Sequence, residues 1–189
     1  MLNRRDAIRG LALAVGVGAS GWAERALAAA GPAPALTWTP TALTQDQARL
    51  LDVVAELIIP ATDTPGARAA GVPQFIDRAV GDYYEKGQVE QLLGGFARMD
   101  ADARAAHGDV FVALAPEHQV ALLTAYDQEA GVARGQNQSH FFTALEDMVT
   151  VGYFTSEAGA TEALKYDPVP GAYHGCVPLA EVGRAWATR

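Results

Sequence analysis

The side chains best suited to chemistry in this chain are one cysteine and four histidines. Cys176 is the single cysteine of the 189 residues, and His174 lies two positions before it. A thiol becomes a catalytic nucleophile when a base lies against it and a third group orients that base. No Asn or Asp with this orienting role is evident, so the sequence gives a Cys176–His174 catalytic pair little support.

The other three histidines, His107, His118 and His140, are scattered along the chain. They form neither the H-E-x-x-H pattern nor the histidine and cysteine spacing of a zinc site, and we interpret them as surface or helix-cap residues. The G-x-S-x-G, P-loop and C-x-x-C-H motifs are also missing from the sequence. The sequence therefore predicts neither a catalytic site nor a metal site in this chain.

Gly16, Gly18 and Gly21 match the G-x-G-x-x-G spacing of a dinucleotide-binding turn. Such a turn needs a helix after the last glycine and an acidic residue about 20 positions later, which binds the ribose. No carboxylate lies between Glu24 and Asp46. We therefore predict no nicotinamide or flavin cofactor in this chain.

Residues 1–28 have the pattern of an export signal. A basic start containing Arg4 and Arg5 precedes a moderately apolar stretch over 10–21, and residues 26–28, Ala-Leu-Ala, suit a signal peptidase. The apolar stretch is shorter than the roughly 20 residues that span a bilayer. Paired arginines indicate the twin-arginine route for folded proteins, although Ala-Ile-Arg at 7–9 replaces the usual Phe-Leu-Lys, and an ordinary secretion signal is the alternative. Either route places the mature protein in the periplasm.

The composition of the remaining chain excludes several classes of function. Without residues 1–28 the chain has 10 basic and 20 acidic residues, a formal charge of −10. Such an acidic chain is not expected to bind nucleic acid or an anionic membrane surface. Its length suits one domain with one core, which we place at residues 44–189, after an Ala-, Pro- and Thr-rich tether at 29–43.

Helical periodicity dominates the chain after the tether. Thr44 and Gln47 form a capping box, and an apolar stripe follows it as far as Pro60. We predict further helices from Val72, over 88–106, from Pro116 and after a Ser139 cap, with Phe75, Ile76, Val80, and Tyr83 or Tyr84 in the core of the second. No segment alternates like a half-buried strand. The predicted fold is mainly α, a small bundle of about five helices.

The C-terminal tail, residues 155–189, has a different composition. Prolines at 168, 170 and 178 prevent a long helix, and Tyr166, Tyr173 and Trp186 are large side chains in an irregular stretch. A proline-stiffened tail loses less entropy on docking, so it suits binding across another protein, although it could also pack on its own helices. In an exported chain Cys176 is then a buried thiol or half of an intermolecular disulfide, which its position in the tail favours.

Two separated segments carry a resemblance to a known family. They read ELIIPATDTPGARAAGVPQFID over 56–77 and GYFTSEAGATEALKYDPVPGAYHGCVPL over 152–179. In composition, order and spacing the chain resembles the gluconate 2-dehydrogenase subunit 3 family, the small subunits of bacterial FAD-dependent sugar dehydrogenases. The signature positions of the family fall on Ile59 and Pro60, 65–67, 152–157, Tyr166, 168–171, Tyr173 and 175–178.

The resemblance implies a helical subunit without a cofactor, bound to a larger FAD-containing subunit of the glucose-methanol-choline oxidoreductase type. A multihaem cytochrome c is the implied third subunit. The small subunit would act as an export escort, presenting the twin-arginine signal to the translocase on behalf of its folded flavoprotein partner. Candidate partner contacts are Tyr153, Phe154, Tyr166, Pro168, Pro170, Tyr173, His174 and Cys176, with Cys176 as the candidate intermolecular disulfide.

Two alternatives from other functional classes stay open at this point. One is a self-contained periplasmic enzyme that uses Cys176 with His174, and the other is a periplasmic module that binds a small molecule alone. For Pro60, Pro65, Gly66 and Gly171 we expect a role in turns, and for Gly152 a close approach between helices.

Overall fold

The computed structural model describes residues 35–169, 171–172 and 176–187. The predicted export signal, including Arg4 and Arg5, and the glycine pattern at 16–21 lie outside these residues. The same holds for Pro170, Tyr173 and His174 among the predicted partner contacts. The expectations for these positions therefore stay predictions.

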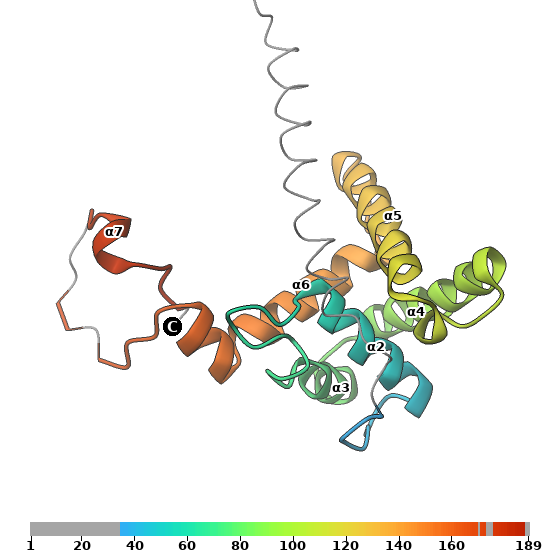
Figure 1. Ribbon diagram of the computed structural model, residues 1–189, viewed down its shortest axis with the longest axis horizontal. Helices are drawn as coiled ribbons and strands as arrows, with labels where there is room; N and C mark the ends of the chain where they lie inside the picture. The colour runs from blue at the N-terminus through green and yellow to red at the C-terminus, as the bar shows by residue number, and fades with distance from the viewer. Residues whose placement is uncertain (1–34, 170, 173–175, 188–189) are drawn as a thin grey trace, which may run out of the picture.

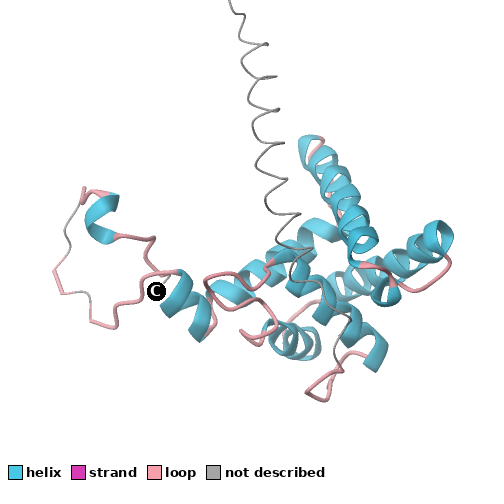
Figure 2. Ribbon diagram, viewed as in Figure 1, coloured by secondary structure: helices cyan, strands magenta, loops and turns pink. Residues whose placement is uncertain are grey.

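The described chain is helical, as the sequence predicts (Figures 1 and 2). No strand occurs in the described ranges, where β structure is limited to one isolated bridge. The elements in chain order are α2 (Gln45–Ile58), α3 (Val72–Asp82), α4 (Lys86–His107), η1 (Phe111–Ala113), α5 (Pro116–Gly135), α6 (Phe141–Phe154), η2 (Gly159–Ala163) and α7 (Leu179–Val182).

Local signals position most helix ends correctly. The Thr44 side chain accepts a hydrogen bond from the Gln47 N–H, and the Gln47 Oε1 accepts one from the Thr44 N–H at 2.9 Å, which confirms the capping box. The first helix ends at Ile58, two residues before Pro60. At the fifth helix the predicted Ser139 cap is wrong, because the neighbouring His140 occupies the cap position and its Nδ1 accepts from the Phe142 N–H.

Helix α6 is the central element of the bundle, and α3, α4 and α5 all pack against it. A Cβ added to Gly95 of α4 would collide with the ring of Phe141, and one added to Gly152 of α6 would lie 2.9 Å from Cδ1 of Phe75. The expected close approach at Gly152 is therefore confirmed. Of the glycine pair in α4, Gly95 faces the contact and Gly94 faces open space.

The core residues predicted for α3 are partly wrong. Ile76 and Val80 are buried, but Phe75 is 41% exposed and Tyr83 is 85% exposed, whereas Tyr84 is partly buried against the core. Helix α3 packs against α2 and α6. The ring of Phe75 lies next to Gly152 of α6 but stays partly exposed.

Residues 35–43, expected to be part of a tether, are attached to the bundle. Leu43 is buried, and Leu36 and Trp38 pack against the core. The buried carboxylate of Asp77 accepts hydrogen bonds from the N–H groups of Thr41, Ala42 and Leu43 and from the Thr41 hydroxyl, at 2.7 to 3.1 Å. This attachment depends on a residue 34 positions or more along the chain, so local composition did not reveal it.

Candidate functional site

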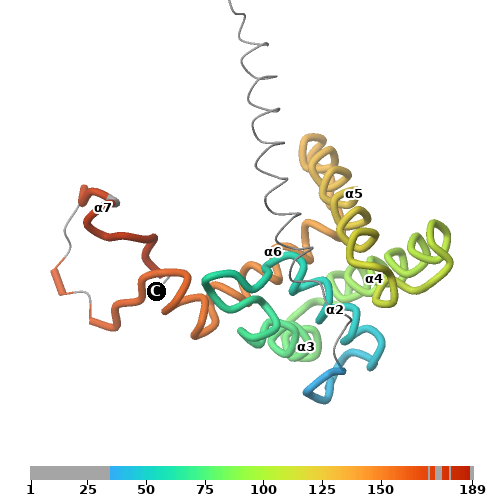
Figure 3. The backbone as a smooth tube through the Cα atoms, viewed as in Figure 1, coloured from blue at the N-terminus to red at the C-terminus, as the bar shows by residue number. Residues whose placement is uncertain are grey.

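The most distinctive surface feature is an arm, of which the structure describes residues 164–169, 171–172 and 176–187. Figures 1 and 3 show it leaving the bundle after η2, running out to α7 and returning to the start of the arm, away from the other helices. Of the two expectations for the tail, packing on its own helices holds for its first part, where η2 packs on α6, but not for the described residues of the arm. A segment held away from the bundle is available to another protein.

Four large apolar side chains of the arm are exposed. Their exposed fractions are 55% for Tyr166, 80% for Val169, 42% for Val177 and 51% for Trp186. Pro168 is exposed as well. Aromatic side chains in such positions are the common anchors of protein interfaces. The arm therefore has the composition of a contact surface.

The start and end of the arm are joined at a neck. The Lys165 N–H donates to the carbonyl oxygen of Ala185, and the Ala187 N–H donates to the carbonyl oxygen of Lys165, both at 2.8 Å. These bonds form the isolated bridge between Lys165 and Trp186. The Lys165 ammonium lies 4.4 Å from the centre of the Trp186 ring, a cation–π contact. The Arg184 guanidinium also donates to the carbonyl oxygen of Glu162.

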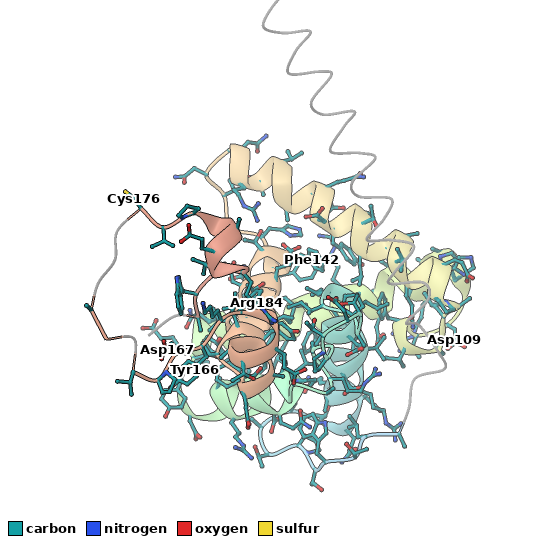
Figure 4. The ribbon with its side chains drawn as sticks, turned by 60° about the vertical axis from the view of Figure 1, so that its left-hand side comes forward. Asp109, Phe142, Tyr166, Asp167, Cys176 and Arg184 are labelled. Carbon is teal, nitrogen blue, oxygen red and sulfur yellow. The ribbon has the colours of Figure 1, made fainter. Side chains whose placement is uncertain are left out.

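Cys176 lies on the arm with its side chain exposed, as Figure 4 shows. The interpretation of Cys176 as a buried thiol is therefore wrong, because the arm has no core of its own that could cover it. The predicted intermolecular disulfide stays a prediction. The structure also does not test the pairing with His174, which lies outside the described residues.

The arm is attached to the bundle by a tight joint at the end of α6. Ser156 Oγ donates to the carbonyl oxygen of Tyr153 at 2.6 Å and accepts from the Gly159 N–H at 3.0 Å. A Cβ at Gly159 would collide with the same Tyr153 carbonyl oxygen. Only glycine therefore allows η2 to pack this closely on α6, and the packing sets the direction in which the arm begins.

The conspicuous loop between α2 and α3 is held from within. The Glu56 carboxylate accepts from the N–H groups of Ala61 and Arg68 at 3.3 and 2.9 Å. A Cβ at Gly66 would lie 2.6 Å from the Ala61 nitrogen and would also collide with the Glu56 carboxylate. The Arg68 guanidinium pairs with Asp52 at 2.7 Å. These residues stabilise the loop, so its unusual sequence is explained by folding.

The prediction that Tyr153 contacts the partner is wrong. Its side chain is only 2% exposed, and its hydroxyl donates to the carbonyl oxygen of Pro65 at 2.7 Å. Its neighbour Phe154 is half-buried against the core. The helical period of α6 places the Tyr153 side chain on the face that points toward the core. The position of Tyr153 next to the tail in the sequence does not show this. Of the predicted contacts, Tyr166, Pro168 and Cys176 lie exposed on the arm.

A separate shallow pocket of about 530 Å³ lies between α4, α5 and the loop before α6. Arg98, Glu129 and His140 line it together with alanine, valine and glutamine side chains. The Arg98 guanidinium donates to Glu129 at 2.7 Å, and this bond raises the pKa of Arg98. The charged groups of the pocket thus pair with one another, and their arrangement is that of a structural ion-pair network.

The histidines behave as expected for surface and cap residues. His107 and His118 are exposed and stack on each other with ring centres 3.9 Å apart, and His140 caps α6. Among the described residues, no group of three or more His, Cys, Asp or Glu side chains could hold a metal ion. No helix in those ranges has the length and apolar character needed to cross a bilayer.

Comparison with protein families decides the assignment of the chain. A family described as Gluconate 2-dehydrogenase subunit 3 matches residues 45–171, which is more than half of the chain. The chain belongs to this family. The resemblance seen in the two sequence segments is thereby confirmed. Comparisons with curated proteins and with solved structures gave no match.

The name of the gluconate 2-dehydrogenase subunit 3 family implies an accessory subunit of a dehydrogenase complex, and therefore a partner chain. The family match begins at the first residue of α2 and extends into the arm. The described positions of the sequence resemblance fall into two groups. Those near Pro65 and Gly152 take part in contacts of the bundle, whereas Tyr166, Pro168, Val169 and Cys176 are exposed on the arm.

The residues of the neck were missed as functional candidates. Lys165 and Arg184 look like ordinary surface charges in the sequence, and Trp186 looks like one more large side chain in an irregular tail. One weak signal is present, because lysine and tryptophan in the same irregular segment can form a cation–π contact. Only the returning path of the arm shows that Trp186 pairs with Lys165.

Proposed function

We propose that this chain is the non-catalytic small subunit of a periplasmic, membrane-associated FAD-dependent sugar dehydrogenase complex. Its larger partner, of the glucose-methanol-choline type, holds the FAD and carries out the oxidation. A multihaem cytochrome c takes the electrons in a third subunit. The small subunit stabilises the flavoprotein and escorts it through the twin-arginine translocase. No catalytic, cofactor or metal role is assigned to its own residues.

The observation that carries this proposal is the arm. Its exposed residues Tyr166, Val169 and Trp186 give it an apolar surface that the chain itself does not cover. A small domain rarely leaves several large apolar side chains together on a projecting segment unless another protein covers them. Family membership supplies the class of partner, a dehydrogenase subunit.

Cys176 supports the same assignment. Its thiol is exposed on the arm, so it can reach a cysteine of the partner without any rearrangement of the bundle. In the oxidising periplasm two such thiols lose two electrons and two protons to the disulfide-forming machinery of that compartment and form one S–S bond. We therefore propose a disulfide between Cys176 and the flavoprotein subunit.

Native mass spectrometry of the complex from periplasmic extract tests this function. We expect one species that contains this chain, a larger flavoprotein and FAD. In denaturing conditions the two chains should stay linked without reductant and separate with reductant, and Cys176→Ser should separate them in both. If this chain occurs alone after gentle lysis, the subunit assignment is wrong.

The escort role has its own test. Replacing Arg4 and Arg5 together by lysine should leave both this chain and the flavoprotein in the cytoplasm, because the twin-arginine route depends on the paired arginines. The control is Arg9→Lys, which leaves the pair intact and should leave export unchanged. Export of the flavoprotein in the double variant would contradict the escort role while leaving the subunit assignment in place.

A further inference from the structure

The arm and the bundle differ sharply in charge. Residues 44–163 contain seven basic and 18 acidic residues, a net charge of −11, whereas residues 164–187 contain two basic and two acidic residues and are neutral. Three of the four arm charges, those of Lys165, Arg184 and Asp167, have local roles. Lys165 and Arg184 hold the neck, and the Asp167 carboxylate accepts from the Val169 N–H at 3.0 Å.

The neck closes the arm without help from a partner. Two backbone hydrogen bonds and the Lys165–Trp186 cation–π contact join the outgoing and returning parts of the arm, and the Arg184 bond ties the returning part to Glu162 of η2. A closed segment loses less conformational entropy on binding than an open one of the same length. The neck therefore reduces the conformational entropy that the arm loses when it binds its partner.

The joint at the base positions the closed arm relative to the bundle. Gly159 is buried and packs on the Tyr153 carbonyl oxygen, and the Tyr153 hydroxyl donates to the carbonyl oxygen of Pro65. A continuous series of contacts thus runs from the loop before α3 through the end of α6 to the arm. Each contact is made within the chain and does not need a second protein.

We infer that the arm binds as one closed, preformed unit in an apolar and uncharged recess of the flavoprotein subunit, with its neck and Gly159 as the positioning elements. This inference rests on the proposed function and adds the chemistry of the contact. The flanking acidic bundle stays outside the recess, because burying unpaired carboxylates there would be costly. In this scheme Trp186 contributes its exposed surface to the contact and also closes the neck through Lys165.

The test measures how fast the purified complex loses this chain after dilution in reductant, so that a disulfide does not mask the effect. Trp186→Ala removes the cation–π contact and should raise the dissociation rate about tenfold by opening the arm. Hydrogen exchange of the Lys165 and Ala187 amides in the free chain should rise in the same variant. Trp186→Tyr retains an aromatic face for Lys165, so its dissociation rate and its amide exchange rates should lie close to those of the wild type.

A second variant separates positioning from direct contact. Gly159→Ala changes a buried residue that cannot touch the partner, yet it should speed dissociation by shifting η2 and the arm. The matched control is Gly94→Ala on an exposed face of α4, where a Cβ meets nothing within 4 Å. Val132→Ala, an exposed apolar residue of α5, is the surface control. Both controls should dissociate at the wild-type rate.

The outcomes distinguish the inference from the proposed function. If wild-type chain and flavoprotein never form a complex, the proposed function fails and the inference fails with it. If the complex forms but Trp186→Ala opens the neck without changing the dissociation rate, only the inference is overturned. The inference is also overturned if a folded Gly159→Ala variant dissociates at the wild-type rate. It is likewise overturned if Val132→Ala speeds dissociation as much as Trp186→Ala does.

Discussion

The hydroxyl of Tyr153 donates a hydrogen bond of 2.7 Å to the carbonyl oxygen of Pro65, 88 residues earlier in the chain. This bond joins the last turn of α6 to the loop that leads into α3. The same turn carries the joint on which the arm is built. Tyr153 thus contacts the loop through its hydroxyl and the joint of the arm through its carbonyl oxygen.

Tyr153→Phe should lower the free energy of unfolding by about 1 kcal/mol, because it removes the hydroxyl donor and keeps the buried ring. Urea unfolding followed by circular dichroism measures this change. Tyr166→Phe is the matched control, since Tyr166 is 55% exposed, and its stability should equal that of the wild type. Equal losses of unfolding free energy in the two variants would show that the hydrogen bond to Pro65 does not contribute to stability.

The glycine pair of α4 offers a direct test of helix packing. Gly95→Ala should destabilise the protein by about 1 to 3 kcal/mol, because the new methyl group collides with Phe141. Gly94→Ala should stabilise it by up to about 1 kcal/mol, since alanine favours the helix and the site is open. Thermal unfolding of both variants gives the comparison, and a stabilising Gly95→Ala would contradict the close approach of α4 and α6.

Asp77 should make stability depend on acid pH. Burial alone would raise the pKa of Asp77, but hydrogen bonds from Thr41, Leu43 and Ala42 hold it below the ordinary value of 3.8. The stabilisation is therefore present above pH 3.8 and is lost as the pH falls through the lowered pKa.

Asp77→Asn should cost about 2 kcal/mol at neutral pH, where the wild type has its charged acceptor. The difference from wild type should shrink as the pH falls below 3.8. Urea unfolding as a function of pH measures it. A difference that stays constant down to pH 2 would argue against the carboxylate as the source of the stabilisation.

Glu146 should lower the stability of the protein as the pH rises toward neutral, whereas Asp77 raises it as the pH rises from acid values. Burial, together with the charges of Asp127 and Asp147, raises the pKa of Glu146 to about 7 from 4.5, against the opposing effect of Arg134. The folded protein thus binds a proton that the unfolded chain has released, so stability should fall as the pH rises from 4.5 to about 7.

Glu146→Gln should remove this decline, because the amide stays neutral. Its melting temperature should match that of wild type near pH 4.5 and exceed it at pH 8, by an amount corresponding to about 1 kcal/mol for this half-exposed group. Glu157→Gln, at an exposed position that is not among the charges acting on Glu146, is the control. A constant difference between Glu146→Gln and wild type over this pH range would contradict the raised pKa.

Much of the bundle could be predicted because its signals are local. The capping box at Thr44 and the apolar stripe behind it depend on residues within a few helical turns, and so does the start of α5 at Pro116. The errors fell where tertiary contacts compete with local ones. The attachment of residues 35–43 to Asp77 depends on such contacts, whereas at α6 two neighbouring residues, Ser139 and His140, could both act as the cap and His140 does so.

The sequence by itself determined the helical class, the family and the unusual composition of the tail. These follow from residue types and short-range spacing, which do not change with the path of the chain. Only the tertiary structure decided that Tyr153 is buried and that Tyr166 and Cys176 are exposed on an arm. It also decided that Lys165 and Trp186 close this arm, because contacts between residues far apart in the chain form only when η2 packs on α6 and the tail turns back.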